Sequence, residues 1–223
     1  MNKKLEDSLG KLAMLLWFGY ATYLQIFSMA ATIIHRAEIS MWQLALVSQI
    51  ASSVFFLLIV YFTITRLPPR DSAEGLEPRI TAIAGTFIMM LLIVLPLGVV
   101  GPEIRLLSAI LILVGTILSA YCIRQLGRSF SIMATARKLV TEGPYKIVRH
   151  PLYGAEVITI FGLVLNHWTV PAAALGIIWI ALQIRRAQNE ERILRASFPE
   201  YNDYARRVPM LLPGFIAPKS SRA

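Results

Sequence analysis

The chain has 223 residues, of which 56% are hydrophobic and 16% are charged, with a mean hydropathy of +0.61. Soluble domains are usually less apolar and about a quarter charged, so the composition indicates a membrane protein. The net charge of +9 is compatible with nucleic-acid binding, but basic cytoplasmic loops give the same balance, and we expect no nucleic-acid partner. The single cysteine, Cys122, excludes an intramolecular disulfide, and three histidines without ligand spacing give no reason to expect a metal site.

Four apolar stretches of the first half are long enough to cross a bilayer, which needs about 20 helical residues. They contain no Lys, Arg, Asp or Glu and cover Leu12–Ile34, Trp42–Thr65, Ile80–Pro102 and Leu106–Ile123. The first stretch lacks a small-residue cleavage site, so we expect it to remain as a span. Polar residues within the spans, such as Gln49, are expected to form hydrogen bonds between helices.

The basic residues of the connections predict how the spans are oriented. They are concentrated in the N-terminal tail, in connection 66–79 and after residue 123, whereas the other two connections carry one Arg each. The positive-inside rule therefore places both termini in the cytoplasm. In a prokaryote the chain would lie in the cell (inner) membrane, and in a eukaryote in the endoplasmic reticulum. Connection 66–79 itself is interpreted as a plain linker.

Two shorter apolar segments, Leu152–Leu165 and Val170–Ile184, follow and are separated by the sequence NHWT. Each is short for a full span, and basic residues flank the pair on both sides. We therefore predict a helical hairpin over 152–184 that enters and leaves from the cytoplasmic side. One long fifth span is the alternative, and it would place the basic tail outside.

The expected fold class is an all-α integral membrane protein with four transmembrane helices, a C-terminal helical hairpin and a cytoplasmic helical tail. A break at Phe198-Pro199-Glu200 should precede a short last helix. Residues 1–123 are expected to be a scaffold of four spans, 124–216 the catalytic and cofactor-binding region, and 217–223 a flexible tail. The chemistry is expected in the second region because the four spans carry no charge.

The segment GPYKIVRHPLYGAE, from Gly143 to Glu156, is the first candidate site. His150 precedes a proline and should be extended, whereas Pro151 suits the first position of a helix. Arg149 and His150 should therefore lie at a helix start, whose free amides attract anions such as a carboxylate or a phosphate. The alternative is that Arg149 is an interfacial charge and His150 a helix cap.

The basic segment 185–209 is the second candidate site. Arg186 and Glu190 are four residues apart and can pair on one helix face, whereas Glu191 should point elsewhere, toward the bundle or a ligand. Tyr201 and Tyr204 should share a face of the last helix. The alternative is a solvated helix with ordinary ion pairs.

Taken together and in order, these segments resemble the isoprenylcysteine carboxyl methyltransferase family of integral membrane methyltransferases, and the compact chain is similar to a prokaryotic relative. The matching pieces are LGRSFS (126–131), KLVTEGPY (138–145), VRHPLY (148–153), RAQNEE (186–191) and FPEYNDYARRVPMLLP (198–213). There are two departures. The family often has Gly where this chain has Ala155, and a His where Arg137 or Lys138 stands before LVT.

The resemblance implies methyl transfer from S-adenosylmethionine to a lipid-like or prenylated acceptor that enters from the bilayer. Carboxyl O-methylation of the isoprenylcysteine type is the expected reaction. Its alternatives are lipid N-methylation, for which Glu191 or His150 would be the base, NADPH-dependent reduction of a sterol-like lipid, and a non-enzymatic lipid-binding scaffold. By the resemblance, Arg186 and Glu191 are catalytic, with Arg186 holding an acceptor carboxylate. The residues implied around the cofactor are Lys138, Leu139, Val140, Gly143, Tyr145, Arg149, His150, Tyr153, Glu191 and Tyr204.

Overall fold

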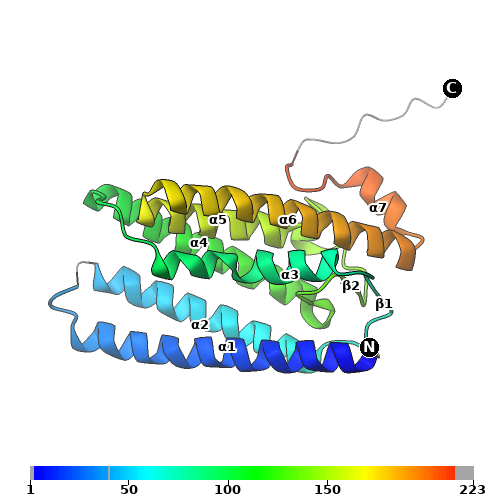
Figure 1. Ribbon diagram of the computed structural model, residues 1–223, viewed down its shortest axis with the longest axis horizontal. Helices are drawn as coiled ribbons and strands as arrows, with labels where there is room; N and C mark the ends of the chain where they lie inside the picture. Colours follow the sequence, from blue (N-terminus) through cyan, green and yellow to red (C-terminus); the bar gives the residue numbers. More distant parts are fainter. Residues whose placement is uncertain (1–2, 40, 214–223) are drawn as a thin grey trace.

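Long helices lie side by side along one axis in the computed structural model, which describes residues 3–39 and 41–213 (Figure 1). The α-helices are α1 (Lys3–Ile34), α2 (Trp42–Thr65), α3 (Glu77–Phe87), α4 (Pro102–Leu126), α5 (Pro151–His167), α6 (Val170–Ser197) and α7 (Tyr201–Arg207). Short 3-10 helices are η1 (Ile88–Val94), η2 (Gly127–Ser129) and η3 (Gly143–Lys146), and the strands are β1 (Asp71–Ser72) and β2 (Thr135–Ala136).

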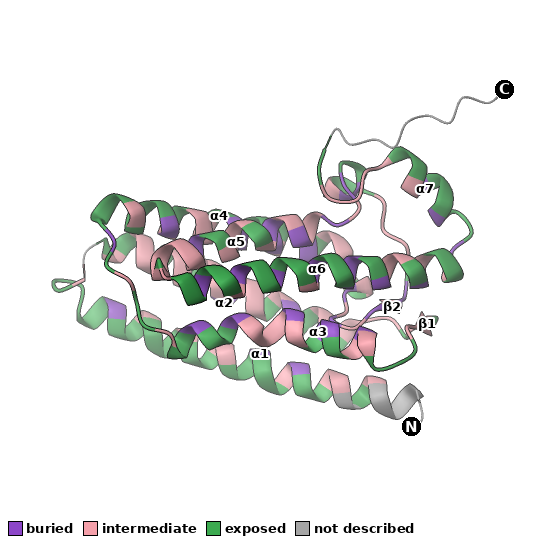
Figure 2. Ribbon diagram, turned by 45° about the horizontal axis from the view of Figure 1, so that its top comes forward, coloured by how far each residue is buried: buried purple, intermediate pink, exposed green. Residues whose placement is uncertain are grey.

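Five helical segments of the described chain are long and apolar enough to cross a membrane. They are Gly10–Ile34, Trp42–Thr65, Glu77–Val94, Pro102–Ser129 and Val170–Ser197. Figure 2 shows that α1 is largely exposed, whereas buried residues gather along α6. Large apolar side chains cover the outside, as expected where lipid replaces water as the solvent. The predicted fold class, an all-α integral membrane protein, is confirmed.

The third span differs from its predicted extent of Ile80–Pro102. Its helix begins earlier, at Glu77, and ends at Val94, after which the chain is irregular up to Gly101. Leu95 is extended because it precedes Pro96. The irregular chain then lies on the end of α5, where the amide of Gly98 donates to the carbonyl of His167 at 2.6 Å.

The predicted hairpin is present as α5 and α6, and the alternative of one long fifth span is wrong. The chain reverses at Trp168, which adopts a left-handed conformation, and Thr169 caps α6 by accepting a hydrogen bond from the amide of Ala172. This turn lies at the same end of the bundle as the α1–α2 connection (Figure 1). The second limb continues beyond Ile184 as a single helix, so that α6 has 28 residues and ends at Ser197.

Connection 66–79 is not the plain linker that its composition suggested. β1 pairs with β2 in antiparallel register, with Asp71 opposite Ala136 and Ser72 opposite Thr135. The amide of Leu67 also donates to the carbonyl of Arg128 at 2.9 Å. The connection is therefore fixed to the segment that follows α4.

Hydrogen bonds between neighbouring spans include the one expected of Gln49. Its amide nitrogen, on α2, donates to the hydroxyls of Ser28 and Thr32 on α1, each at 2.9 Å. Helices α4 and α5 lie closer still, since the hydroxyl of Ser108 donates to the carbonyl of Gly162 at 2.7 Å. Small residues at this contact let the two backbones approach.

Gly115 of α4 has no room for a side chain, because the backbone of α5 passes close to it at Ala155 and Thr159. A Cβ atom on Gly115 would lie 2.6 Å from the amide nitrogen of Thr159 and 2.9 Å from the carbonyl oxygen of Ala155. Ala155 is buried at this interface with α4. The departure from the family pattern at Ala155 therefore concerns helix packing and does not narrow the cavity described below.

We expect Gly115→Ala to destabilise the protein by about 1–3 kcal/mol, because the added methyl group would push α4 and α5 apart. The midpoint of thermal unfolding in detergent measures this effect. Gly154→Ala is the matched control, since a Cβ on Gly154 meets nothing within 4 Å. An equal midpoint for the two variants would contradict the close α4–α5 packing.

Candidate active site

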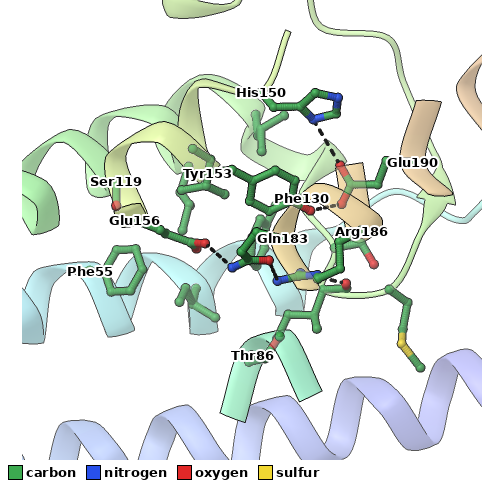
Figure 3. Close-up of a pocket in the computed structure, with 18 of the residues that line it drawn as sticks. Phe55, Thr86, Ser119, Phe130, His150, Tyr153, Glu156, Gln183, Arg186 and Glu190 are labelled. Atoms are coloured by element: carbon green, nitrogen blue, oxygen red, sulfur yellow. Dashed lines mark hydrogen bonds and ion pairs between the residues drawn. The ribbon is translucent and has the colours of Figure 1, made fainter. Parts of the chain in front are cut away.

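A cavity of about 440 Å³ lies inside the bundle, a size typical of small-molecule sites. Its apolar wall includes Phe18 of α1, Phe55 of α2 and Phe87, whereas its polar wall comes from α5, α6 and the segment between β2 and α5. Figure 3 shows the polar side chains pointing toward one another across this space. The cavity therefore draws residues from both halves of the chain.

Arg186 of α6 is the central cation of the cavity and is 7% exposed. One guanidinium nitrogen donates to the side-chain oxygen of Gln183 at 2.8 Å, and a second donates to the carbonyl of Ile132 at 3.1 Å. The guanidinium also lies over the ring of Tyr153, 5.2 Å from its centroid. A Cβ on Gly85 of α3 would lie 2.7 Å from Arg186 Cδ, so glycine is needed where α3 passes this side chain.

The structure does not pair Arg186 with a carboxylate, so the expected Arg186–Glu190 pair is wrong. Glu191 contacts Arg149 and Arg195 instead. Tyr153 donates its hydroxyl to Glu190 Oε1, and His150 Nδ1 lies 3.7 Å from Glu190 Oε2. Glu190 therefore belongs to the wall formed by the start of α5.

Glu156 is the second carboxylate of the cavity. It lies one turn beyond Tyr153 on the same face of α5. Its Oε2 accepts a hydrogen bond of 2.9 Å from the side-chain nitrogen of Gln183, which in turn accepts from Arg186 (Figure 3). Glu156, Gln183 and Arg186 thus form a continuous chain of hydrogen bonds from α5 to α6.

Arg149, which lies just before α5, forms hydrogen bonds to both α6 and the α7 segment. Its Nε lies 2.6 Å from Glu191 Oε1, and its Nη1 donates to the carbonyls of Ala205 and Val208 at 2.7 and 2.8 Å. The backbone amides of Arg149 and His150 donate to the carbonyls of the neighbouring segment 209–210. The pair lies at the start of α5 as predicted, but the hydrogen bonds of Arg149 are made to protein groups.

The last helix is joined to η3 by a buried hydrogen bond. The hydroxyl of Tyr204 donates to the carbonyl of Tyr145 at 2.6 Å. Burial raises the pKa of Tyr204 to about 12, although Arg149 opposes this effect. Burial also raises the pKa of Tyr145 well above its usual value, so both hydroxyls stay protonated at neutral pH.

We expect Tyr204→Phe to cost about 1–3 kcal/mol, because it leaves the carbonyl of Tyr145 buried without its donor. With its raised pKa, Tyr204 contributes stability that is complete below about pH 10 and is lost as the pH rises through about 12. Unfolding midpoints in detergent between pH 7 and pH 11 should therefore fall more steeply for the parent than for the variant. Tyr61→Phe, at an exposed position of α2, should change neither quantity.

Six buried polar atoms of residues that line the cavity have no hydrogen-bond partner among the described residues. They are the hydroxyls of Ser119, Thr135 and Tyr145, Nε2 of His150, and Nε of Arg137 and Arg186. Nε2 of His150 nevertheless lies 3.4 Å from Glu191 Oε1. Buried polar groups in native proteins are nearly always satisfied, so each such atom needs an explanation. Tyr145 and Arg186 are residues expected at the site, and a polar ligand in the cavity would supply their partners.

Seven residues implied around the cofactor line the cavity, and three do not. Those that line it are Lys138, Leu139, Val140, Tyr145, Arg149, His150 and Tyr153. Gly143 has a positive φ of 59° and lies against the side chain of Gln125. Glu191 accepts a hydrogen bond from Arg149, and Tyr204 donates one to the carbonyl of Tyr145, so both contact residues of the cavity wall from behind. Near the expected histidine position, Arg137 and Lys138 both line the cavity, and the buried Arg137 contacts Asp7 at 2.8 Å.

Sequence reasoning missed Glu156, Gln183 and Glu190 as lining residues. Glu156 carried a usable signal, since an acidic residue within an otherwise apolar hairpin limb usually marks a functional site. The aromatic wall from α1 to α3 carried none, because no motif distinguishes it from ordinary span residues. Within the described residues, no three His, Cys, Asp or Glu side chains are arranged to hold a metal ion.

Comparison with known proteins matches the family model of phospholipid methyltransferases to residues 104–201, which include all of α5 and α6 and most of α4. The chain is 43% identical over 79 residues to a methanethiol S-methyltransferase of Bradyrhizobium diazoefficiens, covering 33% of this chain and 28% of the relative. It is 36% identical over 110 residues to protein-S-isoprenylcysteine O-methyltransferase B of Arabidopsis thaliana, covering 46% and 56%.

A nickel-cobalt-cadmium resistance protein of Alcaligenes xylosoxydans xylosoxydans is 39% identical over 77 residues, covering 34% of this chain and 36% of the relative. The matches therefore span between 28% and 56% of the length of these three relatives. The family match includes most of the polar wall of the cavity. The chain is thus an integral membrane protein whose residues 104–201 match the family model of phospholipid methyltransferases and are similar to part of an isoprenylcysteine O-methyltransferase.

Proposed function

We propose that this chain transfers a methyl group from S-adenosylmethionine to an apolar acceptor at the membrane. The observation that carries the proposal is a cavity with one polar wall and one aromatic wall inside a bundle of spanning helices. A polar cofactor suits the first wall, and an acceptor that partitions into lipid suits the second. The family match supports methyl transfer as the reaction.

The polar wall fits the chemistry of this cofactor. S-adenosylmethionine carries a sulfonium, an ammonium, a carboxylate and ribose hydroxyls, and when bound it supplies an electrophilic methyl group. Glu190 and Glu156 provide negative charge for its cations. The unpaired hydroxyl of Tyr145 and the unpaired Nε of Arg186 offer hydrogen bonds for its hydroxyls and carboxylate.

The protein's own task is alignment and exclusion of water. Tyr153 and Gln183 hold Glu190, Glu156 and Arg186 in fixed positions on two adjoining helices. Because those helices are packed within the bundle, the reacting groups would meet in a space that bulk water does not fill. No group of the protein has to form a covalent bond.

The charges around Arg186 bear on the choice of acceptor. A carboxylate acceptor of the isoprenylcysteine type could accept a hydrogen bond from the unpaired Nε of Arg186. It would, however, place a third negative charge beside Glu156 and Glu190. A neutral acceptor avoids this repulsion, and a relative named for methanethiol supports a thiol over the lipid amine of a phospholipid.

The expected partners are the bilayer and a lipophilic substrate, and the cytoplasm is the expected source of the cofactor. The N-terminus, β1, β2 and α7 lie at one end of the bundle (Figure 1). These are the segments that the positive-inside rule places in the cytoplasm, at the inner membrane of a prokaryotic cell. The proposal therefore orients the polar wall of the cavity toward that side.

Ligand binding to the purified protein in detergent tests the proposal against the two other classes. S-adenosylmethionine and S-adenosylhomocysteine should raise the unfolding temperature, and NADPH should not. An increase in the unfolding temperature with NADPH alone would favour a membrane reductase. No shift with any of the three would favour a non-enzymatic scaffold and end the methyltransferase proposal.

A further inference from the structure

Glu156 is the acidic group placed deepest in the cavity. It lies beyond Arg149, His150 and Tyr153 along α5, away from the end of the bundle that holds the basic loops. Thr159 and Ile160, one turn further along, continue the lining toward the apolar part. Glu156 therefore lies where the polar and apolar walls meet, on the side from which a lipophilic acceptor would approach.

One oxygen of Glu156 is held and the other is available. Oε2 accepts the hydrogen bond from Gln183, whereas Oε1 accepts none from the described residues. Glu156 is only partly buried although it lies within the bundle, so its accessible surface is consistent with its place in the cavity wall. An available carboxylate oxygen in such a position can accept a proton from a bound molecule.

The other two carboxylates near the site are already engaged, and His150 lies against both, with Nδ1 3.7 Å from Glu190 Oε2 and Nε2 3.4 Å from Glu191 Oε1. Glu190 accepts from Tyr153, and Glu191 contacts Arg149 and Arg195. The titratable and charged groups around Glu156 are Tyr153 on its own helix, Arg186 and Glu190 on α6, and Cys122 on α4. Arg186 is thus the only cation among these groups.

We propose that Glu156 is the general base for the acceptor, which is therefore a neutral thiol. The inference rests on the proposed methyl transfer and deepens it. The acceptor sulfur bonds to the methyl carbon as the carbon–sulfonium bond breaks, and that bond's electron pair stays on the cofactor sulfur. The thiol proton passes to Oε1 of Glu156, so the products are a methyl thioether, S-adenosylhomocysteine and a neutral Glu156.

Other acceptor classes fit this arrangement less well. An ionised carboxylate has no proton to give and is repelled by Glu156 and Glu190. A hydroxyl is too weak an acid to lose its proton readily to a carboxylate, whereas a thiol, with a pKa of about 8.5 in cysteine, is a closer match. A neutral thiol also leaves the charges of Arg186, the sulfonium and the two carboxylates balanced.

Two matched probes distinguish the acceptor classes with the unaltered protein. N-decanoylcysteine methyl ester offers a thiol and no carboxylate, and N-decanoyl-S-methylcysteine offers a carboxylate and no thiol. With trideuteromethyl-labelled S-adenosylmethionine, mass spectrometry should find label on the thiol probe at least about tenfold faster. Equal or faster labelling of the carboxylate probe, or no labelling of the thiol, would overturn the inference.

The variant Glu156→Gln tests the base itself. It keeps the size of the side chain and an oxygen for Gln183, so the affinity for S-adenosylhomocysteine should stay within about threefold. The rate on the thiol at pH 7 should fall at least about 100-fold, the usual contribution of a general base. This rate should then rise with pH up to about 8.5, because hydroxide replaces the missing base by ionising the thiol.

An infrared difference spectrum gives a readout that does not depend on rate. After a single turnover of the parent protein, a protonated carboxyl band should appear, and Glu156→Gln should lack it. Glu103 is an exposed residue at the start of α4, so Glu103→Gln should change neither the carboxyl band nor the rate of methyl transfer. A parent-like rate and band in Glu156→Gln would contradict the role of Glu156.

These outcomes separate the inference from the proposed function. If the parent protein does not bind S-adenosylmethionine, both the proposed methyl transfer and the role of Glu156 are contradicted. If it binds the cofactor but methylates the carboxylate probe, only the inference of a thiol acceptor is contradicted. The probe comparison uses the parent protein, so it decides the acceptor class even if Glu156→Gln fails to fold.

Discussion

Arg186→Met is expected to lower the rate of methyl transfer at least about 100-fold, the loss typical for removal of one preorganised electrostatic group. Arg186 is the cation at the centre of the cavity, and it connects Gln183 to the carbonyl of Ile132. Methionine replaces the aliphatic part of the arginine side chain and can still pack beside Gly85, so the loss should fall on activity more than on folding. The rate with labelled S-adenosylmethionine and the unfolding midpoint measure the two effects separately.

Arg185→Met is the matched control on the opposite side of the same turn. The Arg185 side chain is 46% exposed, and its Nε lies 2.7 Å from Glu77. A solvated ion pair of this kind contributes at most about 1 kcal/mol, so the rate should stay within about twofold. Equal loss in the two variants would mean that the chemistry does not depend on Arg186.

Arg149→Ala should have the largest effect on stability, about 3–5 kcal/mol, because it removes one partner of a largely buried ion pair. It would also leave the carbonyls of Ala205 and Val208 without their donor. We therefore expect α7 to detach from the start of α5 and cofactor affinity to fall. Hydrogen exchange of residues 201–208, together with the unfolding midpoint in detergent, would show both changes.

Arg195→Ala removes the other cation beside Glu191 and serves as the comparison. Its side chain is 44% exposed and lies 3.2 Å from Glu191 Oε2. Because solvent screens this pair, we expect a cost of less than about 1 kcal/mol and normal protection of residues 201–208. Rapid exchange in both variants, or in neither, would contradict the assignment of Arg149 as the residue that fastens α7.

The spans were predictable because length and charge-free composition are enough to define them. The second helix begins and ends at Trp42 and Thr65, as its flanking charges indicated. The third ended early because a local constraint before Pro96 acts within an apolar run that hydropathy cannot subdivide. Pairing of connection 66–79 with β2 was not predictable, because its partner lies more than 60 residues away along the chain.

Only those residues of the candidate site that belong to recognisable sequence motifs could be predicted. Tyr145, Arg149, His150, Tyr153 and Arg186 were identified from sequence and do lie around one cavity. Pattern alone could not separate residues that face the cavity from those that support them. The apolar wall depends on tertiary packing of α1, α2 and α3 against the C-terminal helices, which local sequence does not specify.

The position of Glu191 illustrates this difference. Its spacing placed it off the face of Arg186, which the structure bears out, but the direction alone could not identify Arg149 as its partner. That contact depends on the turn that returns α7 to the start of α5. Sequence spacing predicts which residues share a helix face, and it does not predict what the face meets.

The most direct test of the account is equilibrium binding of labelled S-adenosylmethionine to the purified protein and to Arg186→Met and Tyr145→Phe. The account predicts saturable binding to the parent protein that S-adenosylhomocysteine displaces and NADPH does not, with weaker binding in both variants. Absence of saturable binding to the parent protein, or displacement by NADPH, would contradict the claim that this cavity holds the methyl donor.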